Sequence, residues 1–458
     1  MEDKRLNLLK NAKVSKAVNT LAAPAIISFL VMAFYNTADG MFVSWLGTDE
    51  VSATQVIFPL MMIANAIGLS FGIGGASYIS RLLGQDDKES AETVVTVNYI
   101  TTIFLGILFA IVTNILIVPI VTLFGADASI LNLTVDYGRF IIIGSVFILP
   151  TMVLNNALRA EGSASLSMIG MLIGSVINII LDPIFIFTLD FGIEGAAMAT
   201  IVSQLFSLVF LTGCYLRKKT ILPLHLSHFK PSVKIYREVL VIGIPTFFRQ
   251  LLVSISMALL NNTAIKYGGS TLLAGLGIAI KLNAIPLYFN FGYAQGMQPV
   301  IGYNFGAKSK ERVLQALKHG ITVQVTVSSI LAILFWFLAP SLFAIFKASS
   351  EVTAVGVWAL RLFLLTDILL AINNSITTYY QSLGKGLQST ILAMARQGYF
   401  YVPLIFILPP IFKINGVLSI QLVADVITTI LCLVMMYSYF KRDGLDTDIA
   451  NSLIKENK

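Results

Sequence analysis

The sequence predicts an all-α integral membrane protein with twelve transmembrane helices, arranged as two six-helix lobes around a central cleft. Of its 458 residues, 56% are hydrophobic and 12% are charged, whereas about 25% of the residues of a soluble protein are charged. Apolar runs of ~20 residues or more can span a bilayer as helices, and they lack the strict alternation of a membrane β-barrel. Matching landmarks in the two halves of the chain predict the two lobes.

The twelve spans are predicted from apolar runs between polar breaks. The first 16 residues are basic, as at the start of a signal peptide, but no small-residue cleavage site ends the apolar run that follows. We therefore expect a retained first helix. Cys214 and Cys432 lie in distant apolar runs, which indicates neither a disulfide framework nor a metal site. The runs begin near residues 18, 52, 93, 135, 165, 195, 238, 271, 318, 354, 388 and 417.

Lys and Arg are concentrated in every second connection between these runs. Cytoplasmic connections of membrane proteins carry an excess of Lys and Arg. With twelve spans, this bias predicts that both termini are cytoplasmic and that the protein lies in the cytoplasmic (inner) membrane. The net charge of +7 therefore needs no nucleic-acid partner. The basic set comprises the N-terminus, 81–92, the connection around Arg159, 216–237, 303–318, the turn at Lys385 and the C-terminal tail, whereas the opposite set contains Lys266, Lys347 and Lys413.

Glycines, prolines and charged loop residues recur at a nearly constant offset between the two halves. Copies with an even number of spans enter the membrane from the same side, so they are parallel tandem repeats related by an axis along the membrane normal. Chance matching of glycines is the alternative. We expect an N-lobe at 1–218, a cytoplasmic interlobe loop at 219–236 and a C-lobe at 237–458. The pairs are Gly74/Gly296, Gly84/Gly306, Lys88/Lys310, Glu89/Glu311 and Gly162/Gly384 at offset 222, and Pro24/Pro245, Gly47/Gly268 and Gly195/Gly416 at offset 221.

A carboxylate in the first apolar run is the main functional candidate. Asp39 lies inside the run from Val18 to about Leu46, and Tyr35 and Asn36 precede it on the same side of the predicted helix. A carboxylate at the middle of a lipid-spanning helix costs roughly 2.5 to 3.5 kcal/mol, so it faces a partner or a water-filled cavity. The alternative is an Asp near the end of the span, where interfacial water reaches it.

A second polar cluster lies in the fifth run. Asn178 and Asp182 are four positions apart and share a helix face. Pro183 cannot donate the bond that the Ile179 carbonyl would receive, which predicts a kinked or broken helix with a free carbonyl beside a carboxylate. That combination suits a proton or a hard cation. In the alternative, the helix ends at Leu181 and Asp182 is an interfacial turn residue.

The second half of the chain does not repeat the acidic residues of the first half. The proline matches align Leu260 with Asp39 and Val402 with Asp182. We therefore expect ion coupling in the first lobe, to which Thr200 adds a hydroxyl on a small-residue face of the sixth run. The embedded charges of the second half are Arg249, Lys281, Arg361, Asp367, Arg396 and Asp425, of which Lys281 and Asp367 are the deepest and could form a pair.

No motif indicates an enzyme. The glycines between Gly72 and Gly75 lie in a helical run rather than after a strand, and the three His do not form a zinc-spaced pair. We expect a transporter that has no cofactor and uses an ion gradient, because ATP-driven export would need a nucleotide-binding partner. The 30 Phe, 16 Tyr and 14 Met are enough to line a cleft for varied apolar cations, although in lipid-facing helices they are simply lipid contacts.

These residues resemble the pattern of the bacterial multidrug and toxic compound extrusion (MATE) family. The resemblance covers essentially the whole chain. It rests on Pro24 and Asp39 in the first span, Asn178 and Asp182-Pro183 in the fifth, and Thr200 in the sixth. Three further phrases fit the family: Arg81-Leu82-Leu83-Gly84 through Lys88, Tyr303-Asn304-Phe305-Gly306 through Lys310, and Arg159-Ala160-Glu161-Gly162.

The resemblance implies a monomeric antiporter in the lipid bilayer that expels small cationic, amphipathic organic compounds in exchange for H⁺ or Na⁺. In the family branch with a first-lobe ion site, the first helix bends at the proline matching Pro24. The residues matching Asp39, Asn178, Asp182 and Thr200 form the cation site, which makes Na⁺ one candidate ion there. The supporting polar network is expected to contain Tyr35, Asn36, Tyr137 and Asn155.

The second lobe departs from the branch of the family that couples ions there. Those members have a Glu in the seventh helix, where this chain has Phe248-Arg249-Gln250. Asp367 resembles the acidic residue of the tenth helix, so Gln250, Lys281 and Asp367 are kept only as C-lobe contributors. Two alternatives stay open. A lipid-linked precursor flippase of the same broader superfamily would use the embedded cations, and a membrane-embedded enzyme would need His or paired acids at one interface.

Overall fold

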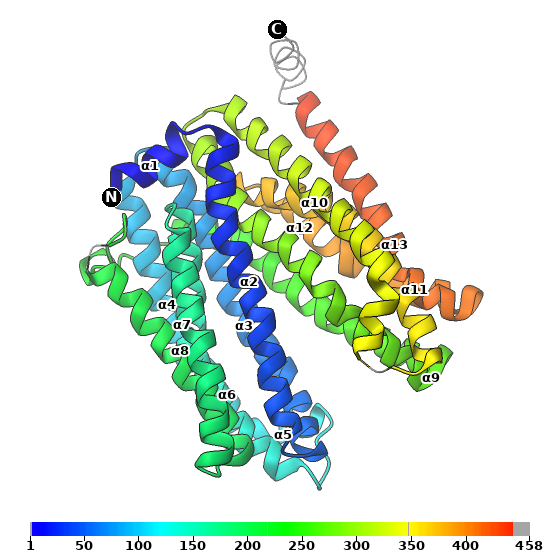
Figure 1. Ribbon diagram of the computed structural model, residues 1–458. Helices are drawn as coiled ribbons and strands as arrows, with labels where there is room; N and C mark the ends of the chain where they lie inside the picture. The colour runs from blue at the N-terminus through cyan, green and yellow to red at the C-terminus, as the bar shows by residue number, and fades with distance from the viewer. Residues whose placement is uncertain (1, 218, 347, 443–458) are drawn as a thin grey trace.

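The structure is a computed structural model that describes residues 2–217, 219–346 and 348–442, and in these ranges the chain is helical without a strand (Figure 1). This confirms the predicted all-α class. The π-helical turns are η1 (Ile184–Thr188) and η3 (Ala395–Tyr399), and η2 (Leu226–His228) is a 3₁₀ turn. The α-helices are α1 (Glu2–Lys10), α2 (Val14–Ser44), α3 (Thr48–Gly84), α4 (Lys88–Ile115), α5 (Ile117–Leu123), α6 (Leu131–Ala160), α7 (Ala164–Pro183), α8 (Gly192–Leu216), α9 (Val233–Gly306), α10 (Lys310–Ile345), α11 (Ser350–Ser382), α12 (Gly386–Met394) and α13 (Tyr401–Arg442).

The predicted twelve spans follow from these helices. Within the described residues, ten helical stretches are long and apolar enough to cross a membrane. Two of them, Val233–Gly306 and Gly386–Lys441, each contain one residue with non-helical dihedrals, Gly269 at φ 64° and Lys413 at φ 51°. Division at these two turns gives twelve spans, in agreement with the prediction.

Two short helices were not predicted. Helix α1 occupies most of the basic N-terminal segment, and α5 follows α4 after a single residue at Leu116. Neither is long enough to span a bilayer. The hydrophobic pattern identifies spans of about 20 residues, so it does not separate these two short helices.

Several helices begin at a capping side chain. The Asp87 carboxylate accepts a bond from the Ser90 N–H at 3.1 Å where α4 starts. The Ser349 hydroxyl accepts one from the Val352 N–H at 3.4 Å where α11 starts. These bonds satisfy backbone donors that have no partner inside their helix.

The two halves repeat the same backbone turns. Residues with positive φ occur at equivalent places in both halves, including one pair that contains no glycine. Such conformations are rare outside glycine, so their recurrence at the sequence offset supports a true tandem repeat rather than chance matching. The pairs are Asp86 (59°) with Lys308 (58°), Gly162 (85°) with Gly384 (71°), and Gly192 (51°) with Lys413 (51°).

The halves form two bundles that lie together at the end of the molecule carrying the termini and diverge toward the other end (Figure 1). Glycines allow the close approach at the joined end. A Cβ on Gly84 would overlap the Tyr303 carbonyl oxygen, and a Cβ on Gly306 would overlap that of Arg81. Close packing of small residues is the usual way in which membrane helices associate, so this seam between α3 and α9 holds the lobes together.

An ion pair and hydrogen bonds between the lobes also lie at the joined end. Arg81 of α3 pairs with Glu238 of α9 at 3.0 Å. The Tyr293 hydroxyl of α9 donates to the Asn19 side-chain oxygen of α2 at 2.6 Å, and His319 Nε2 of α10 lies 3.1 Å from that oxygen. Charged and neutral contacts from four different helices therefore hold the lobes together at the joined end.

The segment between the lobes is attached to the N-lobe. One carboxylate oxygen of Glu161, which is fully buried beyond the end of α6, accepts bonds from the N–H groups of Ile221 and Leu222 at 3.0 and 3.1 Å. Its other oxygen accepts one from the Ser163 hydroxyl at 2.6 Å. Arg5 Nη1 lies 3.9 Å away. Burial raises the pKa of Glu161 to about 7, although these bonds oppose the shift.

Candidate functional site

Asp39 of α2 and Asp182 of α7 lie side by side between two neighbouring helices of the N-lobe. Asp182 has no solvent exposure, and Asp39 is half-buried. Two adjacent ionised carboxylates in a dry environment repel each other strongly unless a proton or another cation lies between them. The two acids that the sequence singled out, 143 positions apart in the chain, thus form one acidic pair.

Asn178 and Thr200 surround the acidic pair. Asn178 Nδ2 donates to Asp182 Oδ1 at 3.1 Å and lies 3.5 Å from the Thr200 hydroxyl of α8. Two buried acceptors, Asn178 Oδ1 and Asp182 Oδ2, have no hydrogen-bond partner among the described residues. Buried polar atoms are almost always satisfied in proteins. Unsatisfied oxygens beside paired carboxylates therefore fit a proton or a bound Na⁺.

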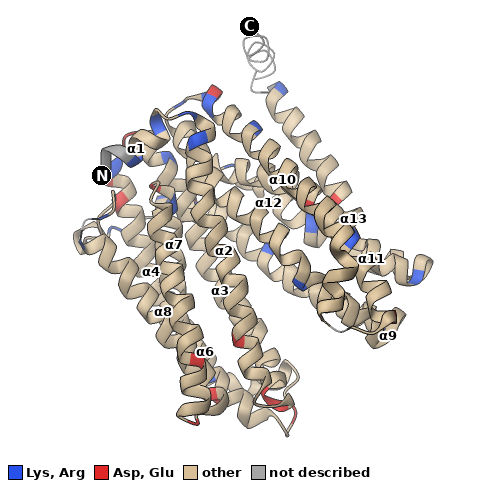
Figure 2. Cartoon of the chain, viewed as in Figure 1, with Lys and Arg blue, Asp and Glu red and all other residues tan. Residues whose placement is uncertain are grey.

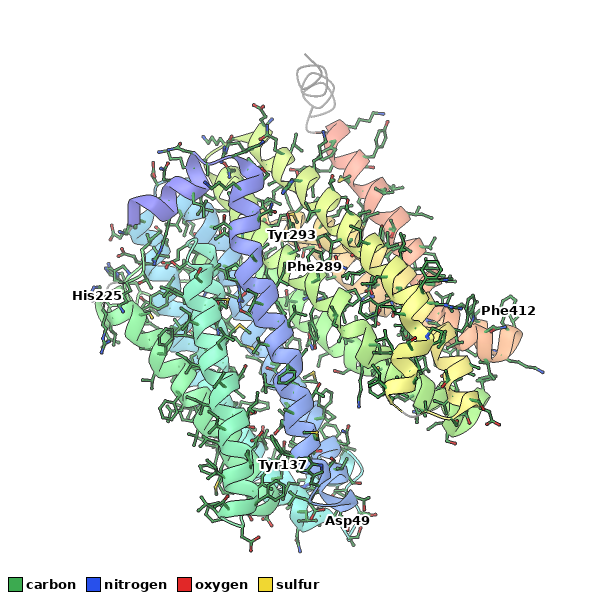
Figure 3. The ribbon with its side chains drawn as sticks, viewed as in Figure 1. Asp49, Tyr137, His225, Phe289, Tyr293 and Phe412 are labelled. Carbon is green, nitrogen blue, oxygen red and sulfur yellow. The ribbon has the colours of Figure 1, made fainter. Side chains whose placement is uncertain are left out.

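Two tyrosines lie within electrostatic range of both carboxylates. Tyr35 is one helical turn before Asp39 on α2, and Tyr137 projects from α6. Figure 3 shows Tyr137 at the end of the N-lobe that is remote from the termini. A phenol group can donate one hydrogen bond and accept others, so these side chains can exchange bonds with the acids as their charge changes.

The sequence suggested that Asp39 lies at the middle of its helix, but the structure places it near one end. Asp39 lies 25 residues after the start of α2 and five before its end, which is about 37 Å from the start at 1.5 Å per residue. It therefore lies nearer the end of the span, as the alternative proposed. Burial of Asp182 and its contact with Asp39 nevertheless separate this pair from a wetted interfacial turn.

The helix at Pro183 is neither broken nor ended at Leu181. Pro183 keeps helical dihedrals of −65° and −28°, and the chain continues into the π-helical turn η1. The wider turn accommodates the ring without ejecting Asp182 from the helix. Pro24 likewise lies inside an unbroken α2, where the Ser28 hydroxyl donates to the Pro24 carbonyl at 2.8 Å.

Two residues expected in the supporting network lie elsewhere. Asn36 is exposed and forms no hydrogen bond with Asp39 or Asp182 in the described chain. Asn155 is 18 residues after Tyr137 on α6, or about 27 Å along the helix. Its side-chain oxygen accepts a bond from the Ser167 hydroxyl at 3.0 Å, and Ser167 accepts one from Arg159. Asn155 thus belongs to a separate buried cluster nearer the joined end.

The C-lobe contains a different arrangement of charges. Arg396 of η3 binds Asp425 of α13 through two bonds of 2.6 and 3.3 Å, a pair that no sequence pattern predicts. Asp367 of α11 is 1% exposed, and neither of its oxygens has a hydrogen-bond partner in the described chain. Lys281 is exposed and forms no ion pair with Asp367, so the pairing considered from the sequence is wrong.

Aromatic side chains meet between the lobes near α2. Phe29 of α2 stacks on Tyr288 of α9, with ring centroids 6.1 Å apart. Tyr288 also lies within electrostatic range of Tyr35. Gln250 of α9 reaches across to the Met62 sulfur at 3.5 Å. The sequence did not single out Tyr288, because an aromatic residue in a span carries no sign of whether it faces lipid or the other lobe.

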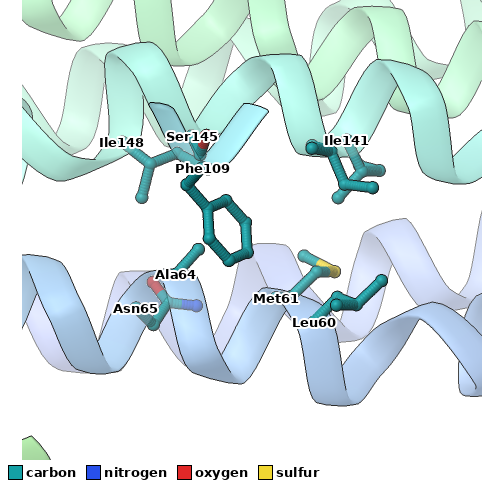
Figure 4. Close-up of a pocket in the computed structure, with 9 residues that line it drawn as sticks. Leu60, Met61, Ala64, Asn65, Phe109, Ile141, Ser145 and Ile148 are labelled. Atoms are coloured by element: carbon teal, nitrogen blue, oxygen red, sulfur yellow. The ribbon is translucent and has the colours of Figure 1, made fainter. Parts of the chain in front are cut away.

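A small cavity inside the N-lobe is separate from this site. It has a volume of about 20 Å³ and is lined mostly by apolar side chains of α3, α4 and α6, including Met61, Phe109 and Ile148 (Figure 4). Such a volume holds about one water molecule, whereas pockets for drug-sized ligands are about 300 Å³ or more. This cavity is therefore a packing defect and not a substrate site.

The acidic pair differs from the metal centres of soluble enzymes. Among the residues that the structure describes, no group of three or more His, Cys, Asp or Glu could hold a metal ion. The oxygens available are those of two carboxylates, one amide and one hydroxyl. Hard monovalent cations and protons bind such oxygens, whereas zinc and other transition metals prefer nitrogen and sulfur.

Comparisons with known proteins agree with this architecture. The MatE family model matches residues 24–184 and, a second time, residues 245–407. The chain is 29% identical to the Multidrug export protein MepA of Staphylococcus saprophyticus over 454 residues, which cover 99% of this chain and 100% of that protein. It is 29% identical to MepA of Staphylococcus haemolyticus over 447 residues, covering 97% and 98% of the two chains.

Solved structures give the same result. A multidrug resistance MATE family transporter of the MOP superfamily, in an outward-facing conformation, superimposes with a TM-score of 0.91 at 29% identity, covering 96% of this chain and 99% of that one. A MOP superfamily transporter from Pyrococcus furiosus, described as having a binding pocket of reverse polarity, superimposes with a TM-score of 0.90 at 28% identity, covering 96% and 98%. Both similarities extend over both lobes.

Proposed function

Because the chain belongs to the MatE family, we propose that it is a multidrug efflux transporter that expels organic cations in exchange for H⁺ or Na⁺. It is a multi-pass membrane protein and not an enzyme. The exported class is taken from relatives that are named multidrug export proteins. The acidic pair of Asp39 and Asp182 is the single observation that carries the coupling part of the proposal.

Exchange follows from competition for the same negative charge. An ionised acidic pair attracts a cation, and in a low-dielectric environment one added positive charge removes most of that attraction. A bound H⁺ or Na⁺ therefore weakens the binding of an organic cation near the pair, and a bound organic cation opposes entry of the ion. Asp39, Asn178, Asp182 and Thr200 are the proposed ion ligands, and Tyr35 and Tyr137 adjust their hydrogen bonds as the charge changes.

The arrangement of the lobes supports a specific order of steps. Lys and Arg gather at the joined end that carries the termini, whereas acidic residues predominate at the far end of the N-lobe (Figure 2). If the basic end is cytoplasmic, the lobes diverge outward. An external ion then reaches the acidic pair, the drug leaves, and rocking of the lobes exposes the site inward to release the ion.

The membrane potential contributes to this cycle. A cytoplasm-negative potential favours entry of one positive charge by about 2.3 kcal/mol per 100 mV. A drug carrying one positive charge outward offsets that contribution. Because both lobes belong to one chain, we propose that a monomer in the cell membrane performs the cycle without a cofactor.

The C-lobe cations were the basis of the alternative, a flippase for lipid-linked precursors. Two of the four are already engaged: Arg396 is paired with Asp425, and Arg361 lies over the Trp336 ring at 5.1 Å. Fewer of these cations are therefore free to bind a pyrophosphate than the alternative assumes. The exporter is accordingly the better supported function.

Ethidium uptake into everted vesicles tests the proposal, with a pH gradient or a Na⁺ gradient imposed one at a time. We expect one of the two gradients to drive ethidium transport by the natural protein. Asp182→Asn should abolish gradient-driven transport, whereas Asp49→Asn should not, because Asp49 is an exposed acid in the first turn of α3. Equal transport with and without either gradient would refute ion coupling.

A further inference from the structure

A groove on the N-lobe lies outside the site described above. It lies between Tyr99 of α4 and the C-terminal end of α8, and its volume is about 440 Å³. Helix α8 is at the outer edge of the N-lobe (Figure 1), so the groove does not open between the lobes. The residues that line it are Tyr99 of α4 and Leu208, Val209, Thr212, Gly213, Leu216 and Arg217 at the end of α8.

The groove is open at Gly213 because glycine has no side chain. A Cβ placed on Gly213 would meet no atom within 4 Å, so the helix surface is open at this position. Val209 and Leu216 flank it and are 59% and 64% exposed. The Tyr99 hydroxyl lies 3.1 Å from the Thr212 hydroxyl and joins the two walls. The groove is thus a fixed, mostly apolar slot that faces away from the protein.

A cationic side chain that has no partner among the described residues lies at one end of the groove. Arg217 follows the last residue of α8, is exposed, and forms no hydrogen bond or ion pair with any residue in the described ranges. Arg5 is close by, since its Nη1 donates to the Lys219 carbonyl at 2.7 Å. The guanidinium of Arg217 is therefore available to an external anion.

The carboxylates in this region are already engaged. Glu161 accepts two backbone bonds and is fully buried, as described above. Glu92, seven residues before Tyr99 on α4, lies 3.3 Å from His228. Neither of these acids forms an ion pair with Arg217 in the described chain, and Lys219 adds a second positive charge near this end of the groove.

The dimensions fit an amphiphile that lies along the helix. Leu208 is nine residues before Arg217, about 13 Å deeper along α8. An acyl chain can occupy the apolar slot while a phosphate reaches Arg217. Basic pockets between transmembrane helices on the cytoplasmic side bind anionic lipid head groups. We propose that an anionic phospholipid of the cytoplasmic leaflet binds in this groove, with its phosphate on Arg217 and one acyl chain over Gly213.

Native mass spectrometry of the full-length transporter tests the proposal, with dioleoyl phosphatidylglycerol and dioleoyl phosphatidylcholine as probes. Phosphatidylglycerol should bind more tightly. Arg217→Gln should weaken its binding roughly fivefold, as expected when one interfacial cation is lost, and leave phosphatidylcholine unchanged. Gly213→Leu, whose Cβ meets no atom within 4 Å, places a side chain in the slot and should weaken the binding of both lipids.

Arg237→Gln is the matched control, because Arg237 is an exposed arginine in α9 that does not line the groove. It should leave both affinities unchanged. Equal losses of phosphatidylglycerol affinity in Arg217→Gln and Arg237→Gln would show a diffuse charge effect and overturn the proposal. An unchanged affinity in Arg217→Gln would also overturn it. Displacement of the lipid by an equal concentration of inorganic phosphate would also overturn it, since the acyl chain would then contribute nothing.

Discussion

Asp182 is fully buried, beside a second carboxylate, and one of its oxygens lacks a hydrogen-bond partner in the described chain. Burial of an unpartnered polar group destabilises a fold. Structural acids are normally placed where they gain partners. The arrangement at Asp182 and Asp39 does not favour stability, and it is the arrangement that the proposed coupling role requires.

We expect one substitution, Asp182→Asn, to have opposite effects on stability and on transport. Asp182→Asn removes the repulsion between the acids while keeping the shape of the side chain. We expect the thermal unfolding temperature of the purified protein at neutral pH to stay the same or rise, while gradient-driven drug export is lost. A fall in unfolding temperature of more than a few degrees would assign Asp182 a structural role.

Glu161 supplies a prediction about pH. Its pKa is raised to about 7 in the folded protein, above its usual value of about 4.3, so the folded state binds more protons than the unfolded state between these values. The contribution of Glu161 to stability is therefore fully present below about pH 4.3 and is lost as the pH rises through 7. The shift corresponds to a loss on the order of 3 kcal/mol.

Thermal unfolding as a function of pH checks this prediction in the natural protein and in Glu161→Gln. Gln resembles the protonated acid, so the variant should lose the decline in stability between pH 5 and 7.5 that the natural protein shows. Asp127, an exposed carboxylate in the connection between α5 and α6, serves as the control site. Parallel pH curves for the natural protein and Glu161→Gln would contradict the assignment.

At the scale of elements, the apolar pattern predicts all twelve spans because each one must present about 20 apolar residues to lipid. It misses α1 and α5, which do not span. It also misses the π-helical turn after Pro183, because a proline predicts disturbance of a helix but not whether the chain kinks, ends or widens.

The acidic site could be predicted only in part, because the sequence pattern does not specify how the helices pack. A charge in an apolar run is visible in the sequence, and so Asp39 and Asp182 could be identified. Their contact depends on the packing of α2 against α7, which no periodicity specifies. For the same reason, Asn155 looked equivalent to Tyr137 although the two lie at different depths of α6.

Helix α2 provides a prediction at this scale. Pro24 leaves one carbonyl of the preceding turn without its helical N–H partner, which makes this part of α2 easier to bend. Pro24→Ala restores the bond, so the variant should be more resistant to thermal unfolding. If transport requires α2 to bend, drug export should become slower in the same variant. Unchanged export would show that the cycle does not use a bend at Pro24.

At the scale of the whole molecule, the seam of glycines between α3 and α9 decides which end is closed. Gly84 and Gly306 allow backbone contact across the lobes, and the Arg81 to Glu238 pair lies at the same end. In the proposed cycle the lobes must open this seam and form it again. We therefore expect its stability to affect the balance between the outward-open and inward-open forms.

Gly84→Val tests the seam, because its side chain would overlap the Tyr303 carbonyl oxygen. We expect spin-label distances between the lobes to show depletion of the form with the joined end closed, together with reduced export. Gly277→Val is the matched control, since a Cβ there meets no atom within 4 Å. A natural distance distribution in Gly84→Val would contradict the role of the seam.

If drug and ion compete for the acidic pair of Asp39 and Asp182, a drug gradient should drive a counter-ion flux in the purified transporter. Proteoliposomes with no initial ion gradient receive ethidium on one side, while internal pH and Na⁺ are recorded with fluorescent indicators. We expect ethidium moving one way to drive H⁺ or Na⁺ the other way, and Asp39→Asn to abolish this flux. Ethidium transport without a counter-ion, or an undiminished flux in Asp39→Asn, would contradict this expectation.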